Sequence, residues 1–145
     1  MFKKILVPTD GSPLALSAAK TAVELAKSHG AQVIGVFVID PFPYIGIGDA
    51  SAAGLQAYLS ESRSVAGQAL DALSKVCAAD GVAFAGDTIE RNVVYEGVIE
   101  TADAEGCDLI VMGSHGRQGV KALVLGSVAQ KVLTHTRLPV LIVKG

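Results

Sequence analysis

The apolar residues of this chain fall into short runs, separated by stretches in which apolar positions recur every three or four residues. Five runs predict strands, at residues 4–8, 32–39, 82–89, 108–112 and 139–143. Most of them are nearly continuous in apolar residues, which is typical of strands covered by helices on both faces. The run at 82–89 is more polar and indicates a strand at an edge of the sheet.

The stretches between these runs predict four helices, at residues 13–29, 51–79, 92–105 and 127–136. The first helix follows a Ser-Pro pair, which suits its N-cap and first helical position, and it stops at a glycine. One face of that helix carries small side chains, which allow it to lie close to a sheet. In the second helix, apolar residues at intervals of three, four or seven predict one buried stripe. A connection containing Pro and Gly, residues 41–50, leads into it.

Strands and helices alternate along the whole chain, which predicts a mainly parallel sheet with helices on both faces. No repeat or linker interrupts residues 1–145, so we expect a single domain. The longest stretch without a charged residue, 28–39, is too short to cross a bilayer, and the charged start does not suit a signal peptide. Cys77 and Cys107 have neither disulfide nor metal spacing and are expected to be buried. These features favour a cytoplasmic protein without a membrane segment.

The net charge of −2 conceals an uneven distribution. Residues 1–108 hold all 14 acidic and 7 basic residues, whereas residues 109–145 hold five basic residues and no acidic one. Two interpretations remain open: an anionic ligand binds in the C-terminal third, or surface charges cluster there without a function. The basic residues are not interleaved with aromatic ones and the chain is acidic overall, which argues against nucleic-acid binding.

The segment after the fourth predicted strand has the strongest chemical pattern. Glycines occupy positions 113, 116, 119 and 126, and Ser127 opens a helix. Glycines let backbone N–H groups approach phosphate oxygens, and a helix N-terminus adds partial positive charge. Arg117 lies between the glycines and offers a charge-assisted bond to a phosphate. The alternative interpretation is a glycine-rich turn that only the chain geometry requires.

Several familiar signatures are absent from the sequence. There is no P-loop, no dinucleotide fingerprint after the first strand and no nucleophile elbow. The three histidines lack the spacing of metal ligands, and the predicted strand ends lack the clustered acids of a phosphoacceptor site. We therefore assign no catalytic residue and no metal ligand.

Motifs spread over the whole chain resemble the universal stress protein family. They are residues 5–12, 38–40, 108–116 and 138–143. The glycines match the family's nucleotide motif, Gly-x2-Gly-x9-Gly-Ser/Thr, at Gly113, Gly116, Gly126 and Ser127.

The resemblance implies a three-layer α/β/α fold, Rossmann-like or flavodoxin-like, with five parallel strands in the order 3-2-1-4-5. It also implies an adenine nucleotide at the topological switch point of the sheet. The nucleotide would be ATP, ADP or an AMP-containing nucleotide, with or without magnesium. Asp10 would accept hydrogen bonds from the ribose hydroxyls. Pro8, Thr9 and Val38 would line the adenine, with Val38 offering backbone hydrogen bonds, and Met112 and Gly113 would border the nucleotide. The phosphates would be held by Gly116, Arg117, Gly126, Ser127 and Val128. From its position before a helix, Asp10 has a second interpretation as a turn or capping residue.

Three functional hypotheses follow from these observations. The first is an ATP-binding stress or signalling protein that acts as a nucleotide-dependent homodimeric regulator. The second is a slow ATPase or autophosphorylating enzyme that uses the same glycine loop, although no water-positioning base or metal carboxylate pair accompanies it. The third is a structural dimer with an empty cleft. An apolar last strand at a sheet edge would pair with its copy through residues 140–143.

Overall fold

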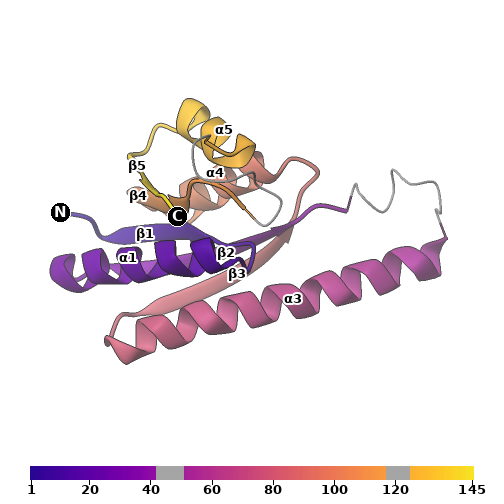
Figure 1. Ribbon diagram of the computed structural model, residues 1–145, viewed down its shortest axis with the longest axis horizontal. Coiled ribbons are helices and arrows are strands. Elements are labelled where there is room, and N and C mark those ends of the chain that lie inside the picture. The colour runs from indigo at the N-terminus through magenta and orange to yellow at the C-terminus, as the bar shows by residue number, and fades with distance from the viewer. Residues whose placement is uncertain (42–50, 117–124) are drawn as a thin grey trace.

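A computed structural model describes residues 1–41, 51–116 and 125–145 of the chain (Figure 1). Its five strands form one parallel sheet in the order β3-β2-β1-β4-β5, which confirms the order that the family resemblance implies. The strands are β1 (Lys4–Pro8), β2 (Gln32–Ile39), β3 (Phe84–Glu90), β4 (Leu109–Gly113) and β5 (Val140–Val143). The helices are α1 (Pro13–His29), α3 (Ala52–Ala79), α4 (Val94–Ala104) and α5 (Ser127–His135). Residues 42–50 of the expected connection and residues 117–124, with Arg117, lie outside the described residues.

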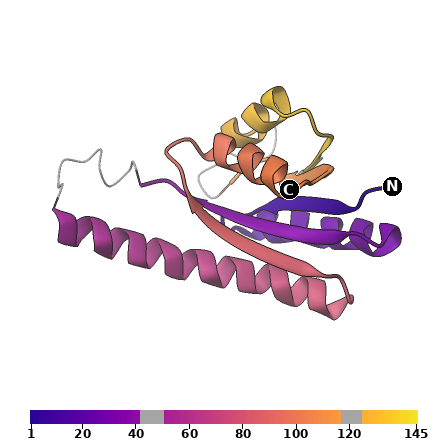
Figure 2. The ribbon, with the colours of Figure 1, turned by 180° about the vertical axis from the view of Figure 1, so that it is seen from behind.

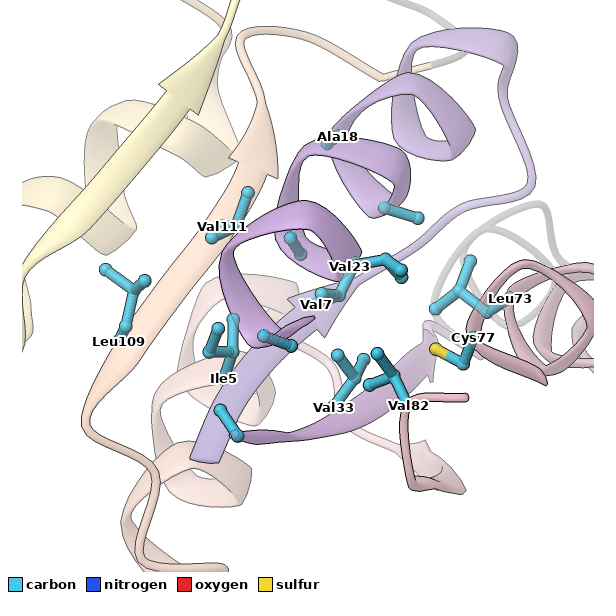
Figure 3. Close-up of a cluster of buried hydrophobic side chains, with 14 residues drawn as sticks. Ile5, Val7, Ala18, Val23, Val33, Leu73, Cys77, Val82, Leu109 and Val111 are labelled. Atoms are coloured by element: carbon cyan, nitrogen blue, oxygen red, sulfur yellow. The ribbon is translucent and has the colours of Figure 1, made fainter. Parts of the chain in front are cut away.

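The helices cover both faces of the sheet, as Figures 1 and 2 show from opposite sides: α1 and α3 lie on one face, α4 and α5 on the other. Figure 3 shows the core on the α1 side, where Ile5, Val7, Val33 and Val111 of the strands point toward the helix that carries Val23. On the opposite face, a second buried cluster joins β1, β2 and β4 to α4 and α5. Burial on both faces explains why the central strands are continuous apolar runs.

The first helix begins and ends as its sequence predicts. The Ser12 hydroxyl accepts a hydrogen bond from the Ala15 N–H at 3.2 Å, and Pro13 occupies the first helical position. Gly30 ends the helix with a left-handed φ of 66° and donates its N–H to the Ala26 carbonyl. The expected small-residue face is buried, at Ala15, Ala19, Ala22, Val23 and Ala26. The small alanine side chains on this face let α1 pack directly on the sheet.

Some element boundaries differ from the prediction by one or two residues. The third strand begins at Phe84, not at residue 82, because the Val82 N–H donates to the Cys77 carbonyl and so still belongs to the end of α3. The fourth helix begins at Val94, not at residue 92, and Val93 at its N-cap makes no side-chain capping bond. The polar third strand lies at an edge of the sheet, as predicted.

The strand order determines where a ligand can enter. Because all five strands are parallel, their carboxyl ends meet at one edge of the sheet. The chain leaves β1 and β4 toward opposite faces, which opens a crevice between the two following loops. Among the described residues, no helix is long and apolar enough to cross a membrane.

Candidate functional site

A cavity of about 580 Å³ lies at the carboxyl ends of β1, β2 and β4. Ten of the eleven residues predicted to bind a nucleotide line it: Pro8, Thr9, Asp10, Val38, Met112, Gly113, Gly116, Gly126, Ser127 and Val128. The eleventh, Arg117, lies outside the described residues. The structure therefore brings together three segments that are far apart in the sequence.

The cavity is also lined by six residues that the sequence interpretation did not assign to the ligand: Ala15, Val36, Val94, Val98, His115 and Ala129. Two of these had a signal in the sequence. Val36 precedes Val38 by two positions and so shares its face of the strand, and Val98 follows Val94 by one helical turn. Neither signal indicates that α4 lies over β2, which only the packing of the sheet determines.

One end of the cavity is apolar. Val36 and Val38 of β2 face Val94 and Val98 of α4, and Met112 of β4 completes this end. Val98 is 1% exposed and Met112 is 6% exposed, so the wall is part of the buried cluster under α4 and α5. This end of the cavity suits a flat, largely apolar group such as an aromatic base.

The backbone of Val38 adds polar groups at the apolar end. Along β2 successive residues point their N–H and C=O groups to opposite neighbours. The Val36 carbonyl accepts from the Thr9 N–H on the β1 side, and the Ile39 carbonyl accepts from the Arg91 N–H on the β3 side. By this alternation the N–H and C=O groups of Val38, like those of Val36, point toward the β1 side. The pairing of β1 with β2 ends at Pro8 and Val36, so the Val38 groups lie beyond it.

The turn between β1 and α1 holds the carboxylate of Asp10. Its Oδ1 accepts a hydrogen bond from the Ser12 N–H at 2.9 Å, and the Thr9 hydroxyl accepts one from the Gly11 N–H at 3.1 Å. Gly11 has a φ of 81°, which favours glycine. Asp10 thus has the turn role that its sequence position suggested. A carboxylate has further acceptor sites, so its role toward a ribose stays a prediction.

Two glycines of the loop stand where a side chain does not fit. A Cβ atom at Gly116 would lie 2.5 Å from Oδ2 of Asp10, and one at Gly126 would lie 2.9 Å from the backbone carbonyl oxygen of Ser114. The Gly126 N–H donates to that same carbonyl at 2.6 Å, which brings the returning end of the loop back to β4. The course of the backbone therefore requires Gly126, whereas a side chain at residue 116 would displace the Asp10 carboxylate. Both glycines expose backbone at the cavity.

The N-terminus of α5 opens onto the cavity without a capping side chain. Gly126 is its N-cap, and the first helical bond runs from the Gln130 N–H to the Gly126 carbonyl. The preceding N–H groups, of Ser127, Val128 and Ala129, have no partner within the helix, and these residues line the cavity. Such N–H groups and the helix dipole attract an anion.

His115 lies between the cavity and the last strand. Its Nδ1 is 3.2 Å from the hydroxyl of Ser114, which is 7% exposed. The Ser114 N–H donates to the Val143 carbonyl at 2.9 Å. These bonds join the start of the glycine loop to the end of β5. In the described part of the chain, no group of three or more His, Cys, Asp or Glu residues has the arrangement of a metal site.

Comparison with known proteins gives the same family at the level of sequence. The profile of the Universal stress protein family matches residues 1–144. Universal stress protein MJ0531 of Methanocaldococcus jannaschii is 38% identical over 145 residues, which cover 99% of this chain and 83% of that protein. A Thermus aquaticus universal stress protein, named for its position 3′ of the QAH/OAS sulfhydrylase region, is 37% identical over 145 residues, covering 99% of this chain and all of that one.

Solved structures have the same fold. The hypothetical protein MJ0577 superposes with a TM-score of 0.85 at 29% identity, over 99% of this chain and 96% of that chain. A universal stress protein solved in complex with cAMP has a TM-score of 0.69 at 23% identity, over 98% and 96% of the two chains. One from Archaeoglobus fulgidus in complex with dAMP has a TM-score of 0.67 at 20% identity, over 97% and 96%. At such identities the last two similarities concern the fold alone. With its profile match, its relatives and its three-layer fold in agreement, this chain belongs to the universal stress protein family.

Proposed function

We propose that this protein binds an adenine nucleotide, ATP in the first place, and acts in stress signalling as a nucleotide-dependent homodimeric regulator. One observation carries the proposal: ten of the eleven predicted residues line one cavity at the carboxyl ends of β1, β2 and β4. This cavity is apolar at one end and has an uncapped helix N-terminus at the other. A nucleotide has the matching division into an aromatic base and an anionic phosphate group. The universal stress proteins solved with cAMP and dAMP support this ligand class.

The Val38 backbone favours adenine over guanine. Adenine carries an amino donor at the ring position where guanine carries a carbonyl acceptor. The carbonyl of Val38 would accept from the adenine amino group, and its N–H would donate to the neighbouring ring nitrogen. With guanine, two acceptors would face each other, and an unpaired buried polar group costs about 1–3 kcal/mol.

The phosphates would lie at the start of α5. The free N–H groups of Ser127, Val128 and Ala129 would donate to phosphate oxygens, with the glycine loop beside them. Magnesium would be held chiefly by the phosphate oxygens, as is usual for this ion. Asp10, at the other side of Gly116, would accept from the ribose hydroxyls.

Calorimetric titration with ATP and magnesium tests the proposal, with GTP as the competing base. We expect ATP to bind and GTP to bind at least tenfold more weakly. Mass spectrometry of small molecules released from the purified protein identifies the ligand that it carries. Absence of heat on titration, together with absence of a bound nucleotide, would refute the proposal.

Slow hydrolysis or autophosphorylation is the alternative use of the same site. A hydrolysing enzyme should release ADP well above a Gly116→Asp variant, in which the new side chain would collide with Asp10 and add a second negative charge beside the proposed nucleotide. Equal traces of ADP from both proteins would leave a protein that binds nucleotide without turnover.

The homodimer rests on the last strand. β5 lies at an edge of the sheet and consists of Val140, Leu141, Ile142 and Val143, with the Leu141 side chain 38% exposed. An apolar, uncharged edge strand invites pairing with another strand. Pairing with its own copy across a twofold axis would cover it.

A further inference from the structure

Helix α4 lies against β2 at a residue that has no side chain. Gly97 is buried, and a Cβ atom there would lie 3.1 Å from both Cγ atoms of Val38 and 3.1 Å from Cδ1 of Ile89. These distances are shorter than ordinary van der Waals contacts, so an added methyl group would force its neighbours to move. Val94 and Val98, on either side of Gly97 in α4, line the cavity together with Val38.

The rest of α4 is anchored where it is. Its buried apolar residues belong to the same cluster as Ile34 and Val36 of β2, whereas the 2.8 Å hydrogen bond from the Thr101 hydroxyl to the Gly97 carbonyl lies within the helix. Val98 and Ala102 are buried against the sheet, at 1% and 0% exposure. The helix therefore has little freedom to retreat as a whole from an added side chain at residue 97.

We propose that Gly97 is a specificity-determining residue of the nucleotide site: with no side chain, it sets the distance between α4 and Val38 and so the width of the cavity's apolar end. The inference rests on the proposed nucleotide function. A larger residue would press the Val38 methyl groups toward the cavity or lift the first turn of α4, with Val94, off the base. The first movement would take up space that a purine needs, and the second would remove contact with it. The described residues at the proposed phosphate end, Gly116, Gly126 and the start of α5, supply none of the atoms nearest to an added Cβ at Gly97, so we expect that end to keep its shape.

The test compares two glycine-to-alanine substitutions in helices. Gly97→Ala adds the methyl group that meets Val38, and the control, Gly67→Ala in α3, adds one that has no atom within 4 Å. ATP and inorganic tripolyphosphate are titrated into wild type and both variants. We expect Gly97→Ala to weaken ATP binding about tenfold and leave tripolyphosphate binding within twofold of wild type, with Gly67→Ala unchanged for both ligands. General damage to the fold would weaken both ligands together.

A double-mutant cycle tests whether Gly97 acts through Val38. Val38→Ala removes two of the three nearest atoms, the Cγ atoms of Val38, and leaves Cδ1 of Ile89, which is the flexible end of its side chain. Gly97→Ala should therefore cost less than about threefold in that background. Because it compares Val38→Ala with the double variant, this test can be made even if Gly97→Ala alone does not fold. A tenfold loss of ATP affinity on adding Gly97→Ala to Val38→Ala would overturn the inference.

The other outcomes are separable. If wild type binds ATP and Gly97→Ala has the same ratio of ATP to tripolyphosphate affinity as wild type, this inference is overturned. The proposed function would still stand. A wild type that binds no ATP would remove the proposed function, and the role of Gly97 with it.

Discussion

At the residue scale, the lack of a Cβ atom at two glycines shapes the candidate site. Gly116 and Gly126 both lie where a Cβ atom would collide, the first with a carboxylate oxygen of Asp10 and the second with the backbone of the loop. In contrast, Cys107 shows how burial changes the chemistry of a side chain outside the site. Each case gives a prediction.

The substitution Gly116→Ala should weaken ATP binding by at least tenfold. The new methyl group would displace either the Asp10 carboxylate or the loop backbone from the proposed ribose and phosphate positions. Calorimetric titration measures the affinity, and thermal denaturation shows whether the fold survives. Gly67→Ala again serves as the matched control. Affinity equal to wild type in a folded Gly116→Ala protein would contradict the role of this loop.

Cys107 should make the stability of the protein fall with pH in the alkaline range. Burial, with the nearby charges of Glu105 and Asp108 and against the opposing effect of Lys4, raises the pKa of the thiol from 9.0 to about 11. Between these values the folded state keeps a proton that the unfolded chain has lost, so the free energy of unfolding decreases as the pH rises. Urea denaturation at several pH values, for wild type and Cys107→Ala, measures the effect. The variant should lose stability less steeply between pH 9 and 11, and identical slopes would contradict this.

At the scale of elements, the helix N-termini differ in a way that matches their roles. Ser12 caps α1 with its hydroxyl, and Ser51 caps α3 in the same manner through the Gly54 N–H. The start of α5 at Gly126 has no such side chain and faces the cavity. Capping stabilises α1 and α3. α4, with Val93 at its N-cap, lacks a side-chain cap as α5 does, but only α5 begins at a glycine of the loop, where its N–H groups would face the proposed phosphates.

Ser12→Ala should lower the free energy of unfolding by about 1 kcal/mol without changing ATP affinity. The hydroxyl is the buried partner of the Ala15 N–H, but Asp10 accepts from the Ser12 backbone, which alanine retains. Urea denaturation and calorimetric titration measure the two quantities. Ser51→Ala, at an exposed cap, should cost less. A loss of ATP affinity in Ser12→Ala would show that the cap also supports the site.

The two edges of the sheet differ at the scale of the whole molecule. β3 has mostly exposed residues, and its Glu90 forms an ion pair with Arg63 at 2.9 Å. β5 is entirely apolar and its outer edge has no covering strand among the described residues. Polar and charged residues discourage pairing at the first edge, and the second is suited to it.

The substitution Leu141→Lys should convert the proposed dimer into a monomer. In a short strand paired with its own copy, the two introduced lysines would lie close together, and like charges across strands repel. Sedimentation at micromolar concentration measures the mass of wild type and variant. Leu133→Lys, at an exposed leucine of α5, is the control for added charge. A monomeric wild type would refute the dimer, and a dimeric Leu141→Lys would place the interface elsewhere.

The local pattern of apolar, polar and turn residues was sufficient to predict the strands and helices of this fold. Apolar runs predicted all five strands, and Ser12, Pro13 and Gly30 marked the limits of the first helix. Boundaries shifted where a tertiary or helix-end contact intervened, as at Val82, whose N–H still closes α3. The glycine spacing predicted close approach of the backbone, which Gly116 and Gly126 show, whereas the phosphate site itself stays a prediction.

The sequence by itself thus determined the order of elements and the family, because both depend on residue types at short spacing and on motifs along the chain. The binding residues that the family resemblance implies stay predictions, although ten of the eleven line one cavity. Only the tertiary structure decided that α4 lies over β2, that Val94 and Val98 wall the cavity, and that Gly97 touches Val38. These relations join residues about 60 positions apart through packing, which depends on the shape of all the neighbours at once. No local periodicity records such contacts, so the dimensions of the base end became visible only in the fold.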